Sequence, residues 1–260
     1  MMWSVILCHD NWLQLWHPEV AVLMILLWTL YDAVNRVRRI AIARDRQIAF
    51  ASALVLVYAS MGTPLKLLGD DFLFTAHMVQ YVLLSMVVAP LLIWGIPPQA
   101  WRTLWELPVV KPVLSLLTYP PIALLLFNTV FSGLLYPRIL DLSLRDNWLY
   151  LVAPYGMLVS AVAMWWPLMS PISESPRLSR GSRLIYLFFN VDLMMPASVY
   201  IIDTGHADYL IYRLAPRVFH LSALADQQLG GIVMSVGMFI AYTVTFLITY
   251  AGYDESHWYE

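Results

Sequence analysis

The chain has 260 residues, of which 60% are hydrophobic and only 12% are charged, and its formal net charge is −2. Soluble domains carry about 25% charged residues, so this composition excludes an ordinary soluble fold and predicts an all-α membrane protein. The single cysteine, Cys8, excludes an internal disulfide and any multi-cysteine metal centre. It is either a small packed residue or a soft-metal ligand.

Hydropathy and turn-forming residues divide the chain into a bundle of about seven transmembrane helices. An apolar run of about 20 residues is long enough to cross a bilayer core as a helix. No repeat or low-complexity segment interrupts the pattern, so we expect one polytopic domain over residues 1–260. The expected spans are 19–34, 48–61, 74–95, 112–135, 148–170, 184–202 and 227–250.

Proline and glycine predict where these spans bend. Gly62-Thr63-Pro64 breaks or kinks the chain after the second span, and Pro120-Pro121 kinks the fourth. We interpret 136–147 as a loop between the fourth and fifth spans, and 203–225 as a longer loop before the seventh.

Basic residues predict how the bundle is oriented in the membrane. Of the 15 Lys and Arg residues, ten fall in one set of alternate loops and five in the other. Cytoplasmic loops carry the excess of positive charge, so we expect the N-terminus outside and the C-terminus in the cytoplasm.

The span 74–95 carries the most informative polar residues, close to its first turn. His77 and Tyr81 are four residues apart and share one face of a helix, with Gln80 beside them. Polar groups within a membrane span are costly, so they usually face protein or water and mark function. The sequence therefore predicts a polar patch, able to bind a metal, at the outer membrane surface.

A second cluster opens the last span. Asp226, Gly230 and Met234 recur every four residues, so one helix face presents a carboxylate, a gap and a thioether, with Gln227 next in the chain. Together with His77 and Met78, this donor set favours copper, especially Cu(I), over hard ions. The loop histidines that can join it are His206 and His220.

Simpler interpretations of the same residues remain open. Asp226 can cap the N-terminus of its own helix, where an acidic residue is favoured. Met78 and Met234 can be packing residues. His77 can be an interhelical hydrogen-bonding residue rather than a ligand.

Asn190 and Asp192 are polar residues inside the sixth span. Asp192 suits a proton relay, an ion site or a structural pair with a partner such as Asn128 or Tyr155. A transporter using Asp192 is a further hypothesis, but no ladder of carboxylates accompanies it. No HExxH, GxSxG or Gly-rich phosphate loop occurs, so we expect neither an enzyme nor a nucleic-acid partner.

Several short sequence motifs, in their order along the chain, resemble those of the CtaG family of polytopic cytochrome c oxidase assembly factors, which are associated with caa-type oxidases. The similarity extends from about Gly62 to Met234. The specific motifs are Ala76-His77-Met78-Val79-Gln80 and Asp226-Gln227-Gln228-Leu229-Gly230-Gly231, and Trp165-Trp166-Pro167-Leu168 and Gly62-Thr63-Pro64 support them.

The resemblance implies a seven-helix protein of the bacterial plasma (inner) membrane that is needed to form an active haem–copper oxidase. It also implies delivery or insertion of copper, with oxidase subunits, other assembly factors and the lipid bilayer as partners. Many family members carry a second histidine where this chain has Tyr81. We therefore predict an assembly factor that handles copper at the outer face. The alternative is an accessory or scaffold subunit of a respiratory complex that binds no metal.

Overall fold

The computed structural model describes residues 15–175 and 177–257, with side chains up to Ala251. Cys8 lies outside the described residues. All regular elements in the described part are helical. In chain order they are α2 (Pro18–Val37), α3 (Arg44–Met61), α4 (Pro64–Leu67), η2 (Leu68–Phe72), α5 (Phe74–Val82), η3 (Leu83–Val88), α6 (Ala89–Gly95), α7 (Pro98–Trp105), α8 (Val110–Leu117), α9 (Pro120–Leu135), α10 (Pro137–Arg145), α11 (Asn147–Met169), α12 (Arg180–Asp203), α13 (Leu210–Leu214) and α14 (Ala223–His257).

The helical membrane bundle predicted from the sequence is confirmed. In the described chain, five helices are individually long and apolar enough to cross a membrane, and the number rises to seven if two bent pairs each count as one span. The expected span 74–95 coincides with the continuous helix Phe74–Gly95, formed by α5, η3 and α6. The spans expected at 19–34, 148–170, 184–202 and 227–250 correspond to α2, α11, α12 and α14.

The other two expected spans are bent pairs. The helix α3 starts at Arg44 and turns by 46° into Pro64–Phe72, which agrees with the break predicted at Gly62-Thr63-Pro64. The expected span 112–135 is divided into α8 and α9, which meet at 77°. The residue before a proline is driven out of the helical region, and Tyr119 accordingly has an extended ψ of 124° before Pro120.

One segment expected to be a loop is helical. Residues 136–147 contain α10, in which Leu140 and Ser143 are buried. Leu140 belongs to the main hydrophobic core, so packing against the bundle stabilises a helix too short to be stable alone.

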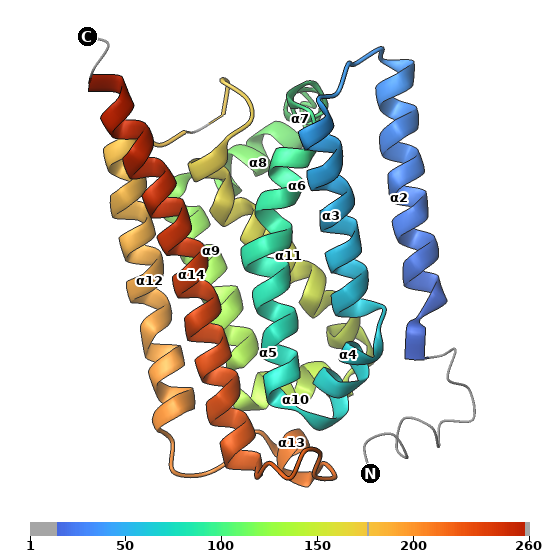
Figure 1. The fold of residues 1–260 in the computed structure, drawn as a ribbon, viewed down its shortest axis with the longest axis vertical. Helices are drawn as coiled ribbons and strands as arrows, with labels where there is room; N and C mark the ends of the chain where they lie inside the picture. Colours follow the sequence, from blue (N-terminus) through green and yellow to red (C-terminus); the bar gives the residue numbers. More distant parts are fainter. Residues whose placement is uncertain (1–14, 176, 258–260) are drawn as a thin grey trace.

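The central helix Phe74–Gly95 runs through the middle of the bundle, as Figure 1 shows. Its α5 segment packs against α14, its α6 segment packs against α3 and α11, and α12 packs against α14 and α9. The helix α2 lies at the side of the bundle beyond α3 and packs on it through Tyr31 and Phe50, whose ring centroids are 4.1 Å apart.

A π-helical turn, η3, precedes Pro90 in the central helix. Pro90 has no N–H to donate to the preceding turn, so a carbonyl there needs another partner. The indole Nε1 of Trp165 donates to the Ser85 carbonyl at 2.8 Å. Trp165, the first residue of the Trp165-Trp166-Pro167-Leu168 motif, therefore links α11 to the π-helical turn η3 through this hydrogen bond.

One end of the bundle, here called the α13 end, is closed by α4, η2, α10 and α13 (Figure 1). Tyr209 stacks on Phe74 with a centroid distance of 4.4 Å, and the Tyr212 hydroxyl donates to the Gly69 carbonyl. Burial raises the pKa of both tyrosine hydroxyls, so they stay neutral donors. The two tyrosines of the α13 region thereby pack over the start of α5.

Candidate functional site

Asp226, at the start of α14, caps the N-terminus of a different helix. Its side chain is 2% exposed, and its carboxylate accepts hydrogen bonds from the backbone N–H groups of Phe74 (2.7 Å) and Thr75 (3.1 Å). The Thr75 hydroxyl donates back to the Asp226 carbonyl at 2.9 Å. Leu73, at the cap position of α5, provides no side-chain hydrogen bond. The first N–H groups of α5 have no partner within the helix, and Asp226, 152 residues away in the chain, accepts their hydrogen bonds instead.

The glycine at 230 allows α5 and α14 to come into close contact. A Cβ built on Gly230 would lie 2.4 Å from Phe74 Cδ1 and 3.2 Å from Met78 Cγ. Met78 and Met234 are fully buried in the main core. The face that carries Asp226, Gly230 and Met234 therefore packs against the face of α5 that carries Met78.

Two glutamines tie the α13 end together. Gln227 is buried, and its Oε1 accepts from the Asp208 N–H at 2.8 Å, which fixes the loop before α13. Gln80 donates through Nε2 to the Leu65 carbonyl at 2.9 Å, which fixes α4 against α5.

His77 has a different environment from its neighbour Met78. The imidazole is 3% exposed, and neither ring nitrogen has a hydrogen-bond partner. Successive helical residues point about 100° apart, and the cavity that His77 lines takes residues from α3, α10 and α11 but none from α14. The His77 ring lies 4.3 Å from that of Tyr81, and both line this small internal cavity.

This His77 cavity has a volume of about 30 Å³, enough for about one or two water molecules or one ion. Ser60 and Met61 line it at the end of α3, and Gln80 lines it from α5. The residues around this small space thus include one with a thioether, one with an imidazole and several with side-chain oxygen atoms.

A charged cluster covers the cavity. Lys66 Nζ donates to Asp70 Oδ2 at 2.8 Å, and the Tyr150 hydroxyl donates to the same oxygen at 2.7 Å. The Lys66 ammonium also lies 4.1 Å from the centroid of the Tyr150 ring. Because Asp70 is paired with Lys66, this cluster carries no net charge.

The same cluster lines a larger depression of about 380 Å³, whose lining does not include His77. Its other lining groups are mostly polar, and include His17, Asp71, Arg145 and Asn147. The cluster of Lys66, Asp70 and Tyr150 therefore borders both this depression, here called the vestibule, and the His77 cavity.

The two loop histidines lie outside this arrangement. His206 is exposed and pairs with Asp208, with 2.9 Å between Nε2 and Oδ1, and His220 is exposed as well. Within residues 15–175 and 177–257, no group of three or more His, Cys, Asp or Glu side chains is placed to hold a metal ion. A metal at this end would depend on His77 together with sulfur or neutral oxygen donors.

In the sixth span, the structure separates two polar positions that lie two residues apart. Asn190 is fully buried in α12, donates to the Tyr186 carbonyl, and lies 3.5 Å from the Asn128 amide nitrogen. Asp192, by contrast, is exposed on the outside of the bundle. Asn128 thus pairs with Asn190 rather than with Asp192, and Tyr155 is exposed on α11.

Met61, Lys66, Asp70 and Tyr150 are the cavity and cover residues to which the sequence had assigned no site role. Lys66 and Asp70 are four residues apart, which is a visible signal for an ion pair on one helix face. No sequence signal linked Tyr150 to them, because it joins from α11, 80 residues away.

The fold and the site define a polytopic membrane protein with a small cavity, lined by His77 and Tyr81, at one end of its helix bundle. The family model for the cytochrome c oxidase caa3 assembly factor (Caa3_CtaG) matches residues 26–253, and the chain belongs to this family. It is thus a multi-pass membrane protein that takes part in cytochrome c oxidase assembly, and the family indicates a non-catalytic role. No curated protein and no solved structure matches the chain.

Proposed function

We propose that this assembly factor, in the bacterial plasma membrane, receives copper as Cu(I) in the His77 cavity and passes it to the oxidase. The observation that carries the proposal is the imidazole of His77, which is buried with both ring nitrogens unpaired. An unpaired buried polar group costs free energy, and such groups in native proteins usually serve a ligand or bind water.

The donors around the cavity favour a soft ion. His77 offers an imidazole nitrogen and Met61 a thioether sulfur, a pair that suits Cu(I). Two carboxylates close to α5 are already engaged, Asp226 by backbone N–H groups and Asp70 by Lys66 and Tyr150. Hard cations prefer several free carboxylate or carbonyl oxygens, which this cavity does not supply.

The surrounding residues give the ion a route and a cover. Copper would enter from the vestibule, which lies at the end that the basic-residue distribution predicts to be outside. Lys66 and Tyr150 would have to move away from Asp70 to open the His77 cavity, and their return excludes water from the bound ion. Met78 and Met234 would support this site by holding α5 against α14, and His206 and His220 would take no part.

The proposal is tested by titrating the detergent-purified full chain with Cu(I) in competition with a chelator. We expect about one Cu(I) per chain for the wild type and a loss of affinity of roughly tenfold or more in His77→Ala and Met61→Leu. Met78→Leu is the matched control, because that buried thioether faces α14, and it should bind copper as the wild type does. Absence of Cu(I) binding in the wild type, or equal binding in all four proteins, would refute the copper role.

A second candidate is a scaffold that stays with the oxidase and binds no metal. The observation that favours it is that Lys66, Asp70 and Tyr150, which line the His77 cavity, are already paired with one another. In that case water alone fills the cavity. Stoichiometric co-purification with the mature oxidase, with no copper in the isolated chain, would support the scaffold. Absence of the chain from the finished enzyme would count against it.

A further inference from the structure

Asp192 lies near the middle of a membrane span and faces away from the bundle. It is the thirteenth of the 24 residues of α12, which places it about 16–18 Å along the helix from either end. Its side chain is exposed, and no hydrogen bond or ion pair reaches it from the described parts of the chain. Intramembrane carboxylates are costly in lipid and almost always face protein or water.

The surroundings of Asp192 are apolar and equally uncovered. Phe188, Met195 and Val199 share its helix face and are 66%, 59% and 51% exposed. An isolated carboxylate among such residues is left in hydrocarbon unless another molecule covers it.

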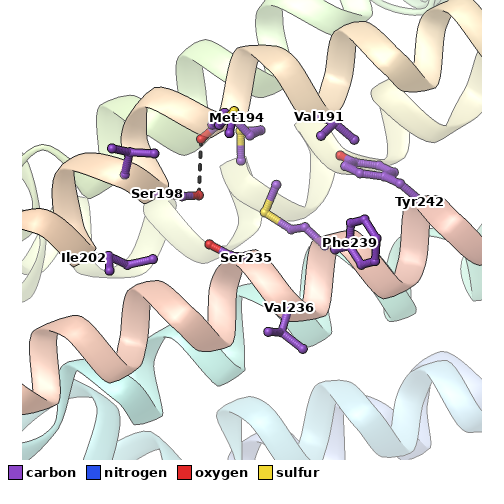
Figure 2. A pocket seen from close by; sticks show the side chains of 11 residues that line it. Val191, Met194, Ser198, Ile202, Ser235, Val236, Phe239 and Tyr242 are labelled. Atoms are coloured by element: carbon purple, nitrogen blue, oxygen red, sulfur yellow. Dashed lines mark hydrogen bonds between the residues drawn. The ribbon is translucent and has the colours of Figure 1, made fainter.

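A groove begins beside this face, between α12 and α14. Figure 2 shows it, lined by Met194, Ser198 and Ile202 of α12 and by Ser235, Val236 and Phe239 of α14. Its volume is about 390 Å³, and Met195 and Val199 belong both to its lining and to the Asp192 face. The Ser198 hydroxyl donates to the Met194 carbonyl and Ser235 donates to the Gly231 carbonyl, so neither side chain projects a free donor toward the groove.

We propose that this face docks one transmembrane helix of a partner protein, which is apolar along the groove and carries a Lys, Arg or other hydrogen-bond donor at mid-membrane depth to pair with Asp192. Small residues such as Ser198 and Ser235 allow a second helix to approach closely, as is usual between membrane helices. The surface is separate from the His77 cavity and does not depend on copper.

The carboxylate decides between the possible occupants. A lipid chain fills an apolar groove but offers no donor to Asp192 within the hydrocarbon region. A second copy of this chain docked symmetrically would bring two Asp192 carboxylates together, which is unfavourable for like charges. A different helix with a donor satisfies both the groove and the carboxylate.

The test is photocrosslinking in intact cells with a benzophenone amino acid placed at Met195 or Val199 of the full chain. We expect both positions to crosslink to the same membrane protein, in a span that contains a donor. The yield should fall roughly tenfold in Asp192→Leu and in Asp192→Lys, and should fall equally when the partner's donor is replaced by Leu. A crosslinker at Leu125, which is exposed on α9, is the control position and should not capture that protein.

Folding is checked separately, because Asp192→Leu removes no hydrogen bond or ion pair within the described chain and should leave the unfolding temperature in detergent unchanged or raised. Crosslinks to lipid alone, to a second copy of the chain, or to a partner at a yield that Asp192→Leu does not change would overturn the proposal. Absence of any crosslink at Met195 and Val199 would overturn it as well.

Discussion

Asp226 and His77 lie at the same end of the bundle and are equally buried, with 2% and 3% of their surfaces exposed, yet their hydrogen bonding is opposite. The Asp226 carboxylate accepts two backbone hydrogen bonds, whereas neither nitrogen of His77 has a partner. Burial alone therefore does not distinguish a structural polar residue from a candidate binding residue. The state of its hydrogen bonds does.

The difference follows from what each residue faces. Asp226 faces the start of α5, where unpaired N–H groups are certain to exist. His77 faces a cavity whose nearest charged groups, Lys66 and Asp70, are paired with each other. Replacing Asp226 should thus cost stability, and replacing His77 should cost function.

The largest expected effect is that of Asp226→Ala. It removes two hydrogen bonds from a buried carboxylate and leaves the Phe74 and Thr75 N–H groups without acceptors, so we expect a loss of about 2–4 kcal/mol. Thermal unfolding in detergent, followed by circular dichroism, measures it. Asp226→Asn keeps one acceptor oxygen and should lie between Ala and the wild type; an unchanged transition in Asp226→Ala would mean that the cap contributes nothing.

Gly230→Ala should have the next largest effect. The added Cβ would lie 2.4 Å from the Phe74 ring, so α5 and α14 must separate, at a cost of about 1–3 kcal/mol. Gly133→Ala in α9 is the matched control, since a Cβ there meets no atom within 4 Å and alanine favours the helix. The same unfolding measurement should show opposite directions for the two variants, and equal shifts would contradict the close contact.

His77→Leu should change stability by only about 1 kcal/mol or less, in either direction. An unpaired buried imidazole makes no hydrogen bond that leucine would lose, and replacing such a group by an apolar one is often neutral. The unfolding temperature is compared with that of Asp226→Ala in the same detergent. A loss as large as that of Asp226→Ala would mean that His77 has a structural partner after all.

The smallest effects are expected for His206→Ala and His220→Ala. Both side chains are exposed, so stability should change by no more than about 0.5 kcal/mol. Cu(I) affinity, measured by chelator competition, should match the wild type in both. A loss of affinity in either variant would mean that a loop histidine contributes to copper binding, so the site would not be confined to the His77 cavity.

Local sequence signals predicted most of the helices but not the faces they present. The helix Phe74–Gly95 was predicted to the residue because a long apolar run and the Gly95-Ile96-Pro97 stop are both local. The break at Pro120 was also predicted from a local signal, the Pro120-Pro121 pair. The sequence indicated a kink within one span, whereas the structure has two helices that meet at 77°. The helix α10 was missed, since its formation depends on packing of Leu140 into the core.

The candidate site was predictable in its parts and not in its assembly. The sequence singled out His77, Gln80 and Asp226 as polar residues near one end of their spans, and the structure buries all three there. It grouped His77 with Met78 and Met234, whereas the structure gives His77 a cavity with Met61 and packs the two other methionines between α5 and α14. Two residues adjacent in a helix point in different directions, and only the neighbouring helices decide what each one meets.

By itself the sequence determined that this is a membrane protein, and it also determined most of its spans, the positions of its bends and its family. Hydropathy, prolines and short sequence motifs are signals that can each be recognised within a single segment. Only the tertiary structure decided that Asp226 caps a helix 152 residues away, that Tyr150 covers the His77 cavity and that Asp192 faces outward while Asn190 faces inward. These outcomes depend on how distant helices rotate and pack against one another, and no local pattern encodes that rotation.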